Sequence, residues 1–352
     1  MSGERALAFA LWLLAAPALA QGFAGLGADA EGFALPQPDR ALAFPADHGA
    51  HPDYRIEWWY LTANLTGPDG AEYGVQWTLF RTALAPETGP PVTGWDSPQV
   101  WFGHAAVTSA TFHAATERFA RGGTGQAGVE AAPFAAWIDD WRMAGESFDA
   151  LRLTASAPDF AYDLTLAAEG PLVLHGDAGY SVKSAEGQAS HYYSQPFYRV
   201  AGQLTLPEGE VPVTGAAWLD REWSSQPLAA DQTGWDWFSL SFDSGEKLMA
   251  FRLRGGAGAF TSGTWIAADG TPAPFGDGVL QAEPLARSAV AGFSVPTRWR
   301  LVLPERGLEV EVDALHPAAW MDLSIAYWEG PVRVTGSHEG RGYLEMTGHD
   351  RP

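Results

Sequence analysis

Residues 57–81 read EWWYLTANLTGPDGAEYGVQWTLFR, two aromatic-rich runs on either side of a Pro-Asp-Gly turn signal. The run after the turn alternates, so that one face of an extended chain carries Tyr73, Val75, Trp77 and Leu79. Successive side chains of a strand point to opposite faces of the sheet. The segment therefore predicts a β-hairpin that turns at Pro68–Gly70 and belongs to an all-β fold.

Short strand-like segments recur along the rest of the chain. They lie near residues 101–110, 151–156, 162–166, 201–206, 213–218, 237–242, 247–253, 261–265, 298–302, 308–314, 330–336 and 342–347. This spacing is typical of antiparallel sandwiches and barrels. A short helix is expected only near Pro317–Met321. Residues 235–252 repeat the order of aromatic strand, tight turn and Phe-Arg seen in residues 58–81, which favours two β-domains related by duplication over a chance echo.

The first twenty residues have the pattern of a secretory signal peptide. Arg5 precedes an uncharged apolar run, Ala6–Ala16, and the segment ends in the small residues before Gln21. Eleven apolar residues are too few to span a bilayer, so we expect cleavage after Ala20 rather than a membrane anchor. We therefore predict a periplasmic or secreted protein, with residues 21–53 as an extended N-terminal arm.

Composition excludes several classes of partner and chemistry. The chain has 42 acidic and 21 basic residues, a net charge of −21, which disfavours nucleic acid and anionic membranes as partners. Cysteine is absent, so disulfides, thiol chemistry and lipoprotein attachment are excluded. The nine histidines form no zinc motif, and neither a nucleophile elbow nor a phosphate loop is present, so no metal or cofactor is expected.

Candidate chemistry concentrates in residues 218–237, WLDREWSSQPLAADQTGWDW. On an extended strand Trp218, Asp220 and Glu222 share one face, and Arg221 points the other way. A carboxyl group in an apolar wall stays protonated more readily, and a second carboxyl beside it adds to that effect. Asp220, with Glu222 second, is therefore our candidate proton donor. The alternative is structural pairing, with Glu222 bound to an arginine such as Arg81 or Arg252.

A second cluster, His191-Tyr192-Tyr193-Ser194, could place water or relay a proton, and we include His191 and Tyr192 among the candidate catalytic residues. The alternative is a half-buried strand. Aromatic side chains and one histidine are predicted to line a ligand cavity: Trp58, Trp59, Trp77, His104, Trp218, Trp235 and Trp237. A single histidine on a strand, such as His104, is also typical of a hydrogen-bonded core.

Five segments stand in order along the chain: Glu57–Tyr60, Trp218–Gln226, Gly234–Phe238, Gly263–Trp265 and Tyr327–Gly330. Together they resemble the AttH-like, lipocalin-like secreted proteins, which are related to carotenoid 1,2-hydratases. The resemblance covers residues 54–348. It implies two lipocalin-like β-barrel or sandwich domains in tandem, over residues 54–225 and 226–352.

The resemblance leaves two functions open. The hydratase branch adds water to a terminal double bond without a cofactor, which implies a hydratase or isomerase acting on an apolar, unsaturated molecule. The secreted branch is associated with transport systems. That association implies a non-catalytic periplasmic carrier of a lipid or polyene, with an ABC-type membrane transporter as its partner. Acidic residues among tryptophans favour the enzyme, and export favours the carrier.

Overall fold

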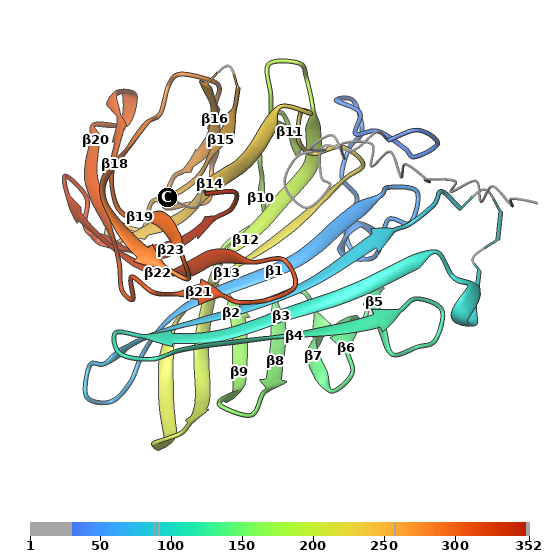
Figure 1. Cartoon of the computed structure of the whole chain (residues 1–352), viewed down its shortest axis with the longest axis horizontal. Coiled ribbons are helices and arrows are strands. Elements are labelled where there is room, and N and C mark those ends of the chain that lie inside the picture. The colour runs from blue at the N-terminus through green and yellow to red at the C-terminus, as the bar shows by residue number, and fades with distance from the viewer. Residues whose placement is uncertain (1–29, 88, 91, 257, 350–352) are drawn as a thin grey trace, which may run out of the picture.

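The computed structural model describes residues 30–349 except residues 88, 91 and 257. The predicted signal peptide lies outside the described residues. The fold is almost entirely β-structure, arranged as two antiparallel sheets that pack side by side (Figure 1). No helix in the described part of the chain is long and apolar enough to cross a membrane.

The first sheet comes from the N-terminal part of the chain. Its strands are β1 (Ile56–Thr66), β2 (Glu72–Ala83), β3 (Gln99–Ser109), β4 (His113–Arg121), β5 (Ala127–Ala131), β6 (Phe134–Ile138), β7 (Trp141–Ser147), β8 (Ala150–Ser156), β9 (Ala161–Ala168), β10 (Val173–Leu174), β11 (Tyr180–Val182), β12 (Ala189–Leu206) and β13 (Gly209–Ser224).

The second sheet follows it in the sequence. Its strands are β14 (Gln232–Phe242), β15 (Lys247–Gly255), β16 (Gly258–Ile266), β17 (Pro272–Phe275), β18 (Gln281–Val290), β19 (Phe293–Leu303), β20 (Leu308–Ala314), β21 (Trp320–Met321), β22 (Tyr327–Gly336) and β23 (Gly340–Met346). Three short 3-10 helices are described, η2 (Ala46–His48), η3 (Gly94–Asp96) and η4 (Pro304–Arg306).

The hairpin predicted from residues 57–81 is confirmed. Strands β1 and β2 pair in register from Ile56↔Thr82 to Thr66↔Glu72 across the predicted turn. On the alternating face, Val75, Trp77 and Leu79 are fully buried in the core of the first sheet, and Tyr73 is partly buried against it. The helix expected near Pro317–Met321 is wrong, because that segment is a turn leading into β21, which pairs with β22.

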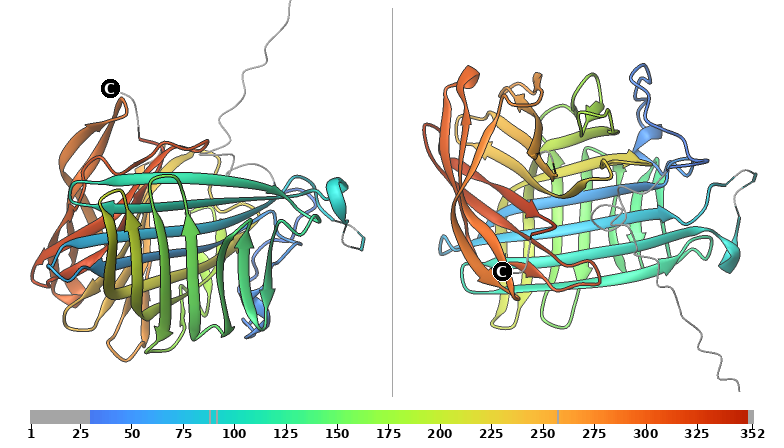
Figure 2. Two further views of the ribbon diagram at one scale, coloured as in Figure 1. Left: turned by 90° about the horizontal axis from the view of Figure 1, so that it is seen from below. Right: turned by 45° about the horizontal axis from the view of Figure 1, so that its top comes forward.

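The first sheet curls over on itself. Its strand order is β4-β3-β2-β1-β13-β12-β9-β8-β7-β6-β5, and the long strands β12 and β13 join its two halves. Strands β5–β9 form a layer that crosses β1–β4, and lie behind them in the right view of Figure 2; the apolar core lies between these layers. The second sheet, ordered β17-β16-β15-β14-β23-β22-β20-β19-β18, curls around its own core. Both sheets are therefore near-barrels, in agreement with the lipocalin-like prediction.

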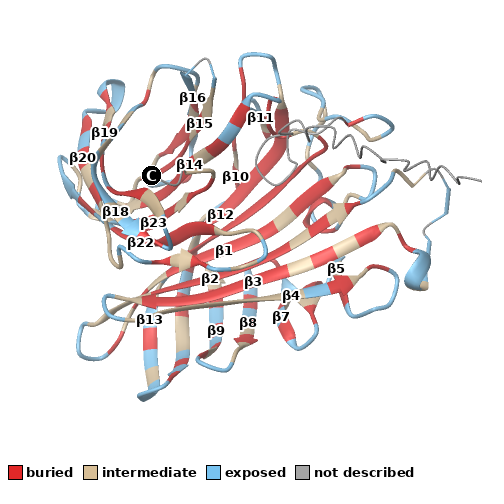
Figure 3. Ribbon diagram, in the orientation of Figure 1, coloured by how far each residue is buried: buried red, intermediate tan, exposed pale blue. Residues whose placement is uncertain are grey.

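The two sheets contact each other closely on their facing sides, where buried residues continue from one to the other (Figure 3). A Cβ atom at Gly74 of β2 would lie 2.5 Å from the Tyr343 hydroxyl and 2.6 Å from Pro331 of the second sheet. Glycine therefore permits the approach of the two backbones at this point. The Tyr60 hydroxyl donates a hydrogen bond to Glu329 Oε1 at 2.5 Å, which ties β1 to β22.

A buried ionic cluster fixes the N-terminal segment to the first sheet. Glu57 has no exposed surface and forms ion pairs with Arg81 and with Arg221, the latter at 3.0 Å. His51 Nδ1 lies 3.1 Å from the same carboxylate, and Arg221 also donates to the Gly49 carbonyl at 2.6 Å. The guanidinium of Arg221 therefore points away from the Asp220 side of β13, as the sequence predicts.

Candidate functional site

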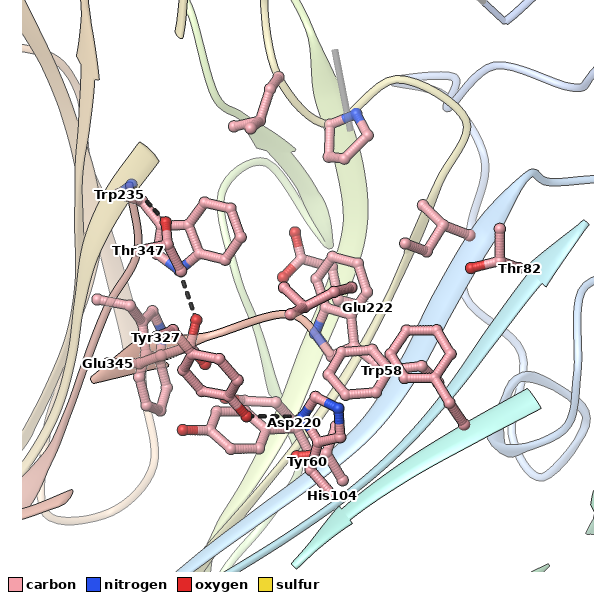
Figure 4. Close-up of a pocket in the computed structure, with 18 of the residues that line it drawn as sticks. Trp58, Tyr60, Thr82, His104, Asp220, Glu222, Trp235, Tyr327, Glu345 and Thr347 are labelled. Carbon is pink, nitrogen blue, oxygen red and sulfur yellow. Dashed lines mark hydrogen bonds between the residues drawn. The ribbon is translucent and has the colours of Figure 1, made fainter. Parts of the chain in front are cut away.

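A cavity of about 370 Å³ lies between the two sheets. Strands β1–β4, β12 and β13 form one wall, and β14, β15, β22 and β23 form the other. Most of the lining is apolar or aromatic, and the polar groups gather where the sheets meet (Figure 4). This size and character are typical of a site for a small organic ligand.

Strand alternation decides which side chains reach the cavity. On β13 Asp220 and Glu222 line it, whereas Leu219 and Trp223 pack in the core of the first sheet. On β1 Trp58 and Tyr60 line the cavity, whereas Trp59, which lies between them in the sequence, packs in the core. The period of two in a strand gives this result directly.

Asp220 lies in an apolar wall and is 2% exposed. Trp218 Nε1 donates to its Oδ1 at 2.7 Å, and the Ser194 hydroxyl donates to the same oxygen. Burial raises the pKa of the Asp220 carboxyl to about 7, although hydrogen bonds from Ser194, Trp218 and Tyr192 act in the opposite direction. Near neutral pH this group therefore exchanges a proton readily, which is the property of a general acid.

Glu222 is paired, and its partner is a lysine rather than one of the predicted arginines. Lys183 Nζ lies 3.0 Å from Glu222 Oε1, and both side chains are 3% exposed. Arg81 instead binds Glu57, and Arg252 binds Asp236 at 2.9 Å. The pairing leaves Asp220 as the carboxyl group of β13 that faces the cavity without a bonded cation.

The second sheet contributes another carboxyl group, Glu345, which the sequence analysis missed. Glu345 lines the cavity and accepts a hydrogen bond from Trp235 Nε1 at 2.6 Å. It stands directly opposite Glu329 across β22 and β23, where side chains are close neighbours. Removal from water, together with the charge of Glu222, raises the pKa of Glu345 above its usual value. Two buried carboxyl groups with raised pKa values therefore face one cavity.

His104 and Tyr327 join the two walls. His104 Nδ1 lies 2.9 Å from the Tyr327 hydroxyl, and both residues line the cavity. Burial lowers the pKa of His104 to about 3, so the imidazole is neutral at physiological pH. The sequence left open whether His104 lines a cavity or is a hydrogen-bonded core residue. The structure shows a buried, hydrogen-bonded side chain that also lines the cavity.

An aromatic row crosses the first sheet from the polar end of the cavity to the sheet edge. The residues are paired strand by strand in register: Glu222↔Trp58, Trp58↔Phe80, Phe80↔Phe102 and Phe102↔Phe119. The Phe80 and Phe102 rings stack with centroids 4.5 Å apart. Phe119, on the edge strand β4, is 52% exposed. An extended apolar chain would find a continuous aromatic floor along this row.

The structure brings seven of the eleven predicted site residues to the cavity: Trp58, His104, Tyr192, Asp220, Glu222, Trp235 and Trp237. The other four lie outside its lining. Trp218 contacts the site through its hydrogen bond to Asp220. Trp59 and Trp77 belong to the core of the first sheet, and the His191 ring is tilted against Trp223 with ring centroids 5.4 Å apart. Each of these three residues occupies the strand face opposite to a cavity residue, so strand parity accounts for their placement.

The missed residues had weak sequence signals. Lys183 is one of two lysines in the chain, a scarcity that is easily taken for composition bias. Glu345 alternates with apolar residues in the last strand, a pattern that also fits a solvent-facing position. No group of three or more possible metal ligands occurs among residues 30–349 as far as they are described.

Comparison with known proteins gives a family and a shared fold. The family model described as AttH-like matches residues 35–349. The crystal structure of an AttH protein from Nitrosomonas europaea is 34% identical, with a TM-score of 0.79, and the match covers 90% of this chain and 100% of that chain. No match was found among curated proteins.

Two further solved structures share the fold at low identity. Kievitone hydratase from Nectria haematococca is 15% identical, with a TM-score of 0.65 and coverage of 90% of this chain and 98% of that chain. CghA in complex with Sch210972 is 13% identical, with a TM-score of 0.50 and coverage of 85% and 89%. At these identities the similarity shows the fold alone.

Proposed function

The chain belongs to the AttH-like family, and from that premise we propose that it binds an apolar, unsaturated small molecule in the cavity between its sheets and transfers a proton to it. The reaction would be hydration or isomerisation of a carbon–carbon double bond without a cofactor. The same fold carries a hydratase in Nectria haematococca, so it can accommodate addition of water.

The observation that carries this proposal is the position of Asp220. Its carboxyl group is buried in an aromatic wall, lines the cavity and has a pKa of about 7. A structural carboxylate would instead be paired with a cation, as Glu57 and Asp236 are. An acid that is partly protonated at neutral pH and faces an apolar ligand can protonate carbon.

The proposed step balances with the two carboxyl groups of the cavity. Asp220 gives its proton to one alkene carbon, and the π electron pair forms the new C–H bond. The ring face of Trp58 stabilises the resulting carbocation. Water then attacks the cation, and its surplus proton passes to ionised Glu345. For isomerisation, Glu345 would take a proton from the neighbouring carbon instead. Exchange with solvent restores both groups.

The test is incorporation of solvent deuterium into carbon. The protein is incubated in D2O with acyclic terpenoids such as farnesol and β-farnesene, and mass spectrometry then follows the products. Proton transfer from Asp220 would place one deuterium on carbon, and hydration would also place a hydroxyl oxygen from water on the neighbouring carbon. Binding of these ligands without deuterium in any product contradicts the enzymatic proposal.

A carrier function is the second candidate, and the aromatic row favours it. That row ends at the exposed Phe119, so an apolar ligand could leave along it without a chemical step. Under this proposal the protein works after export and hands its ligand to a membrane transporter. Binding without turnover in the D2O experiment, together with transfer of the ligand to membranes, would support the carrier.

The titration of Asp220 gives a pH prediction that needs no substrate. Its folded pKa of about 7 exceeds the ordinary value of 3.8. The contribution of Asp220 to the free energy of unfolding is therefore fully present below its ordinary pKa of 3.8, and it is lost as the pH rises through about 7. The active acid form declines over the same upper range. In protein labelled with ¹³C at aspartate carboxyl carbons, one resonance should titrate near pH 7 and be missing from Asp220→Asn. Titration of that resonance near its ordinary value contradicts the prediction.

A further inference from the structure

Lys183 is a buried cation at the polar end of the cavity. It follows β11, and hydrogen bonds fix its backbone: its N–H donates to the Gln188 carbonyl at 2.7 Å, and its carbonyl accepts from Gln232 Nε2 at 2.9 Å. The residue is 2% exposed and lines the cavity. Its position is therefore fixed by both the first sheet and the start of the second.

The Lys183 ammonium has more donors than partners. An ammonium carries three N–H donors. Glu222 Oε1 lies 3.0 Å away, and no other acceptor bonds to Nζ among the described residues. Its remaining neighbours are aromatic, with Nζ 3.7 Å from the Phe251 ring centroid and 4.8 Å from that of Tyr192. A buried donor without an acceptor is costly, so a ligand oxygen placed here would be stabilised.

The charges around Lys183 indicate whether a neutral or an anionic ligand oxygen fits beside it. Glu222 already balances the ammonium, and Asp220 and Glu345 line the same cavity. A ligand carboxylate or phosphate would therefore add a negative charge beside Glu222, Asp220 and Glu345. The other cation of the lining, Arg55, donates to the Ser225 carbonyl. A neutral carbonyl or hydroxyl oxygen accepts a hydrogen bond from Lys183 without that repulsion.

We propose that Lys183 anchors a neutral carbonyl or hydroxyl oxygen at one end of the apolar ligand, whose chain then lies along the aromatic row from Trp58 to Phe119. The inference rests on the proposed function only in using the same cavity. From β13 to β4 the row spans four strand spacings of about 4.8 Å, or roughly 19 Å. The substrate class is thus an elongated unsaturated alcohol or ketone rather than a pure hydrocarbon or an acid.

The chain provides a matched control for Lys183. Lys247, the only other lysine in the sequence, is also buried, at 8% exposure. Its Nζ donates to Ser241 Oγ at 3.0 Å and lies 5.0 Å from the Phe197 ring centroid. It does not line the cavity. Loss of Lys247 therefore removes a buried ammonium from an aromatic setting without touching the ligand site.

The test compares the binding of three probes by calorimetry: β-farnesene, farnesol, and geranylacetone, a ketone with no O–H group. The full chain should bind farnesol and geranylacetone about tenfold more tightly than β-farnesene, as expected for one charge-assisted hydrogen bond. Lys183→Met should abolish that preference, and Lys247→Met should retain it. Equal affinity for all three probes in the full chain, or a preference that survives Lys183→Met, would overturn the proposal.

Two further variants keep the test decisive if Lys183→Met alone does not fold, because that change leaves Glu222 buried without its cation. Lys183→Met combined with Glu222→Leu replaces the pair by apolar groups and should bind β-farnesene but lose the preference for oxygen. Glu222→Gln frees the ammonium and should improve binding of farnesoic acid at least tenfold. No improvement there would also count against Lys183 as the anchor.

The two proposals fail in distinguishable ways. The probe preference reports on Lys183 whether or not any ligand is turned over. Deuterium incorporation reports on Asp220 whichever probe binds best. If the protein prefers the oxygen-containing probes but incorporates no deuterium, the role of Lys183 as an anchor stands and the proposed enzymatic reaction is rejected.

Discussion

Asp220→Asn is expected to lower the rate of deuterium incorporation into a bound terpenoid by about 10²- to 10⁴-fold, the usual contribution of a general acid. The amide has nearly the same shape as the carboxylic acid, and Trp218 and Ser194 can still donate to its oxygen. It cannot supply an acidic proton. Affinity for geranylacetone, measured by calorimetry, should therefore change by only a few-fold.

Two variants control this result. Glu345→Gln should also reduce turnover, because the proposed proton acceptor is lost, and the pKa of Asp220 should remain raised. Asp163→Asn changes an exposed carboxylate paired with Arg152 and should leave turnover unchanged. Wild-type incorporation by Asp220→Asn would show that another group protonates the ligand.

Glu57→Gln is expected to destabilise the protein by about 3–5 kcal/mol, as for removal of one partner of a buried ion pair. Glu57 has no exposed surface and lies between Arg81 and Arg221, which are 1% and 0% exposed. The amide leaves two buried guanidinium groups without their counter-charge. The free energy of unfolding, from urea titration, measures the loss.

The pH dependence of this loss provides an internal check. The two arginines and His51 hold the pKa of Glu57 well below its usual value, although burial opposes them. Its stabilisation is therefore present above the ordinary carboxyl pKa and is lost as the pH falls below it. The difference between wild type and Glu57→Gln should shrink in acid. The exposed Asp163→Asn should cost at most about 1 kcal/mol. A comparable loss in both variants would contradict the special role of the buried cluster.

Local sequence patterns predicted much of the first wall of the cavity. The alternation in residues 73–81 placed Trp77 on one face with Val75 and Leu79, and the same rule placed Asp220 and Glu222 on one face of β13 with Arg221 on the other. A strand has only two faces, so parity follows from spacing alone. Parity does not reveal which face meets the protein core, so it does not distinguish Trp59 and Trp77, which pack in the core, from residues that line the cavity.

Partners across the fold could not be predicted in this way. Glu222 lies opposite Trp58 in the sheet, but its cation comes from Lys183, on the loop before β12. Asp220 receives its hydrogen bonds from Trp218 and from Ser194 of the neighbouring strand. Such contacts depend on the register between strands distant in the sequence, and no local pattern encodes that register.

The sequence by itself determined the all-β class, the first hairpin and the shared face of Asp220 and Glu222, because these follow from side-chain period and turn chemistry over a few residues. Only the tertiary structure decided that Glu222 is neutralised, that Asp220 is buried against a cavity, and that Glu345 faces the same space from the second sheet. The physical reason is that pKa and pairing depend on which groups exclude water from a carboxyl, and the two sheets supply those groups from opposite ends of the chain.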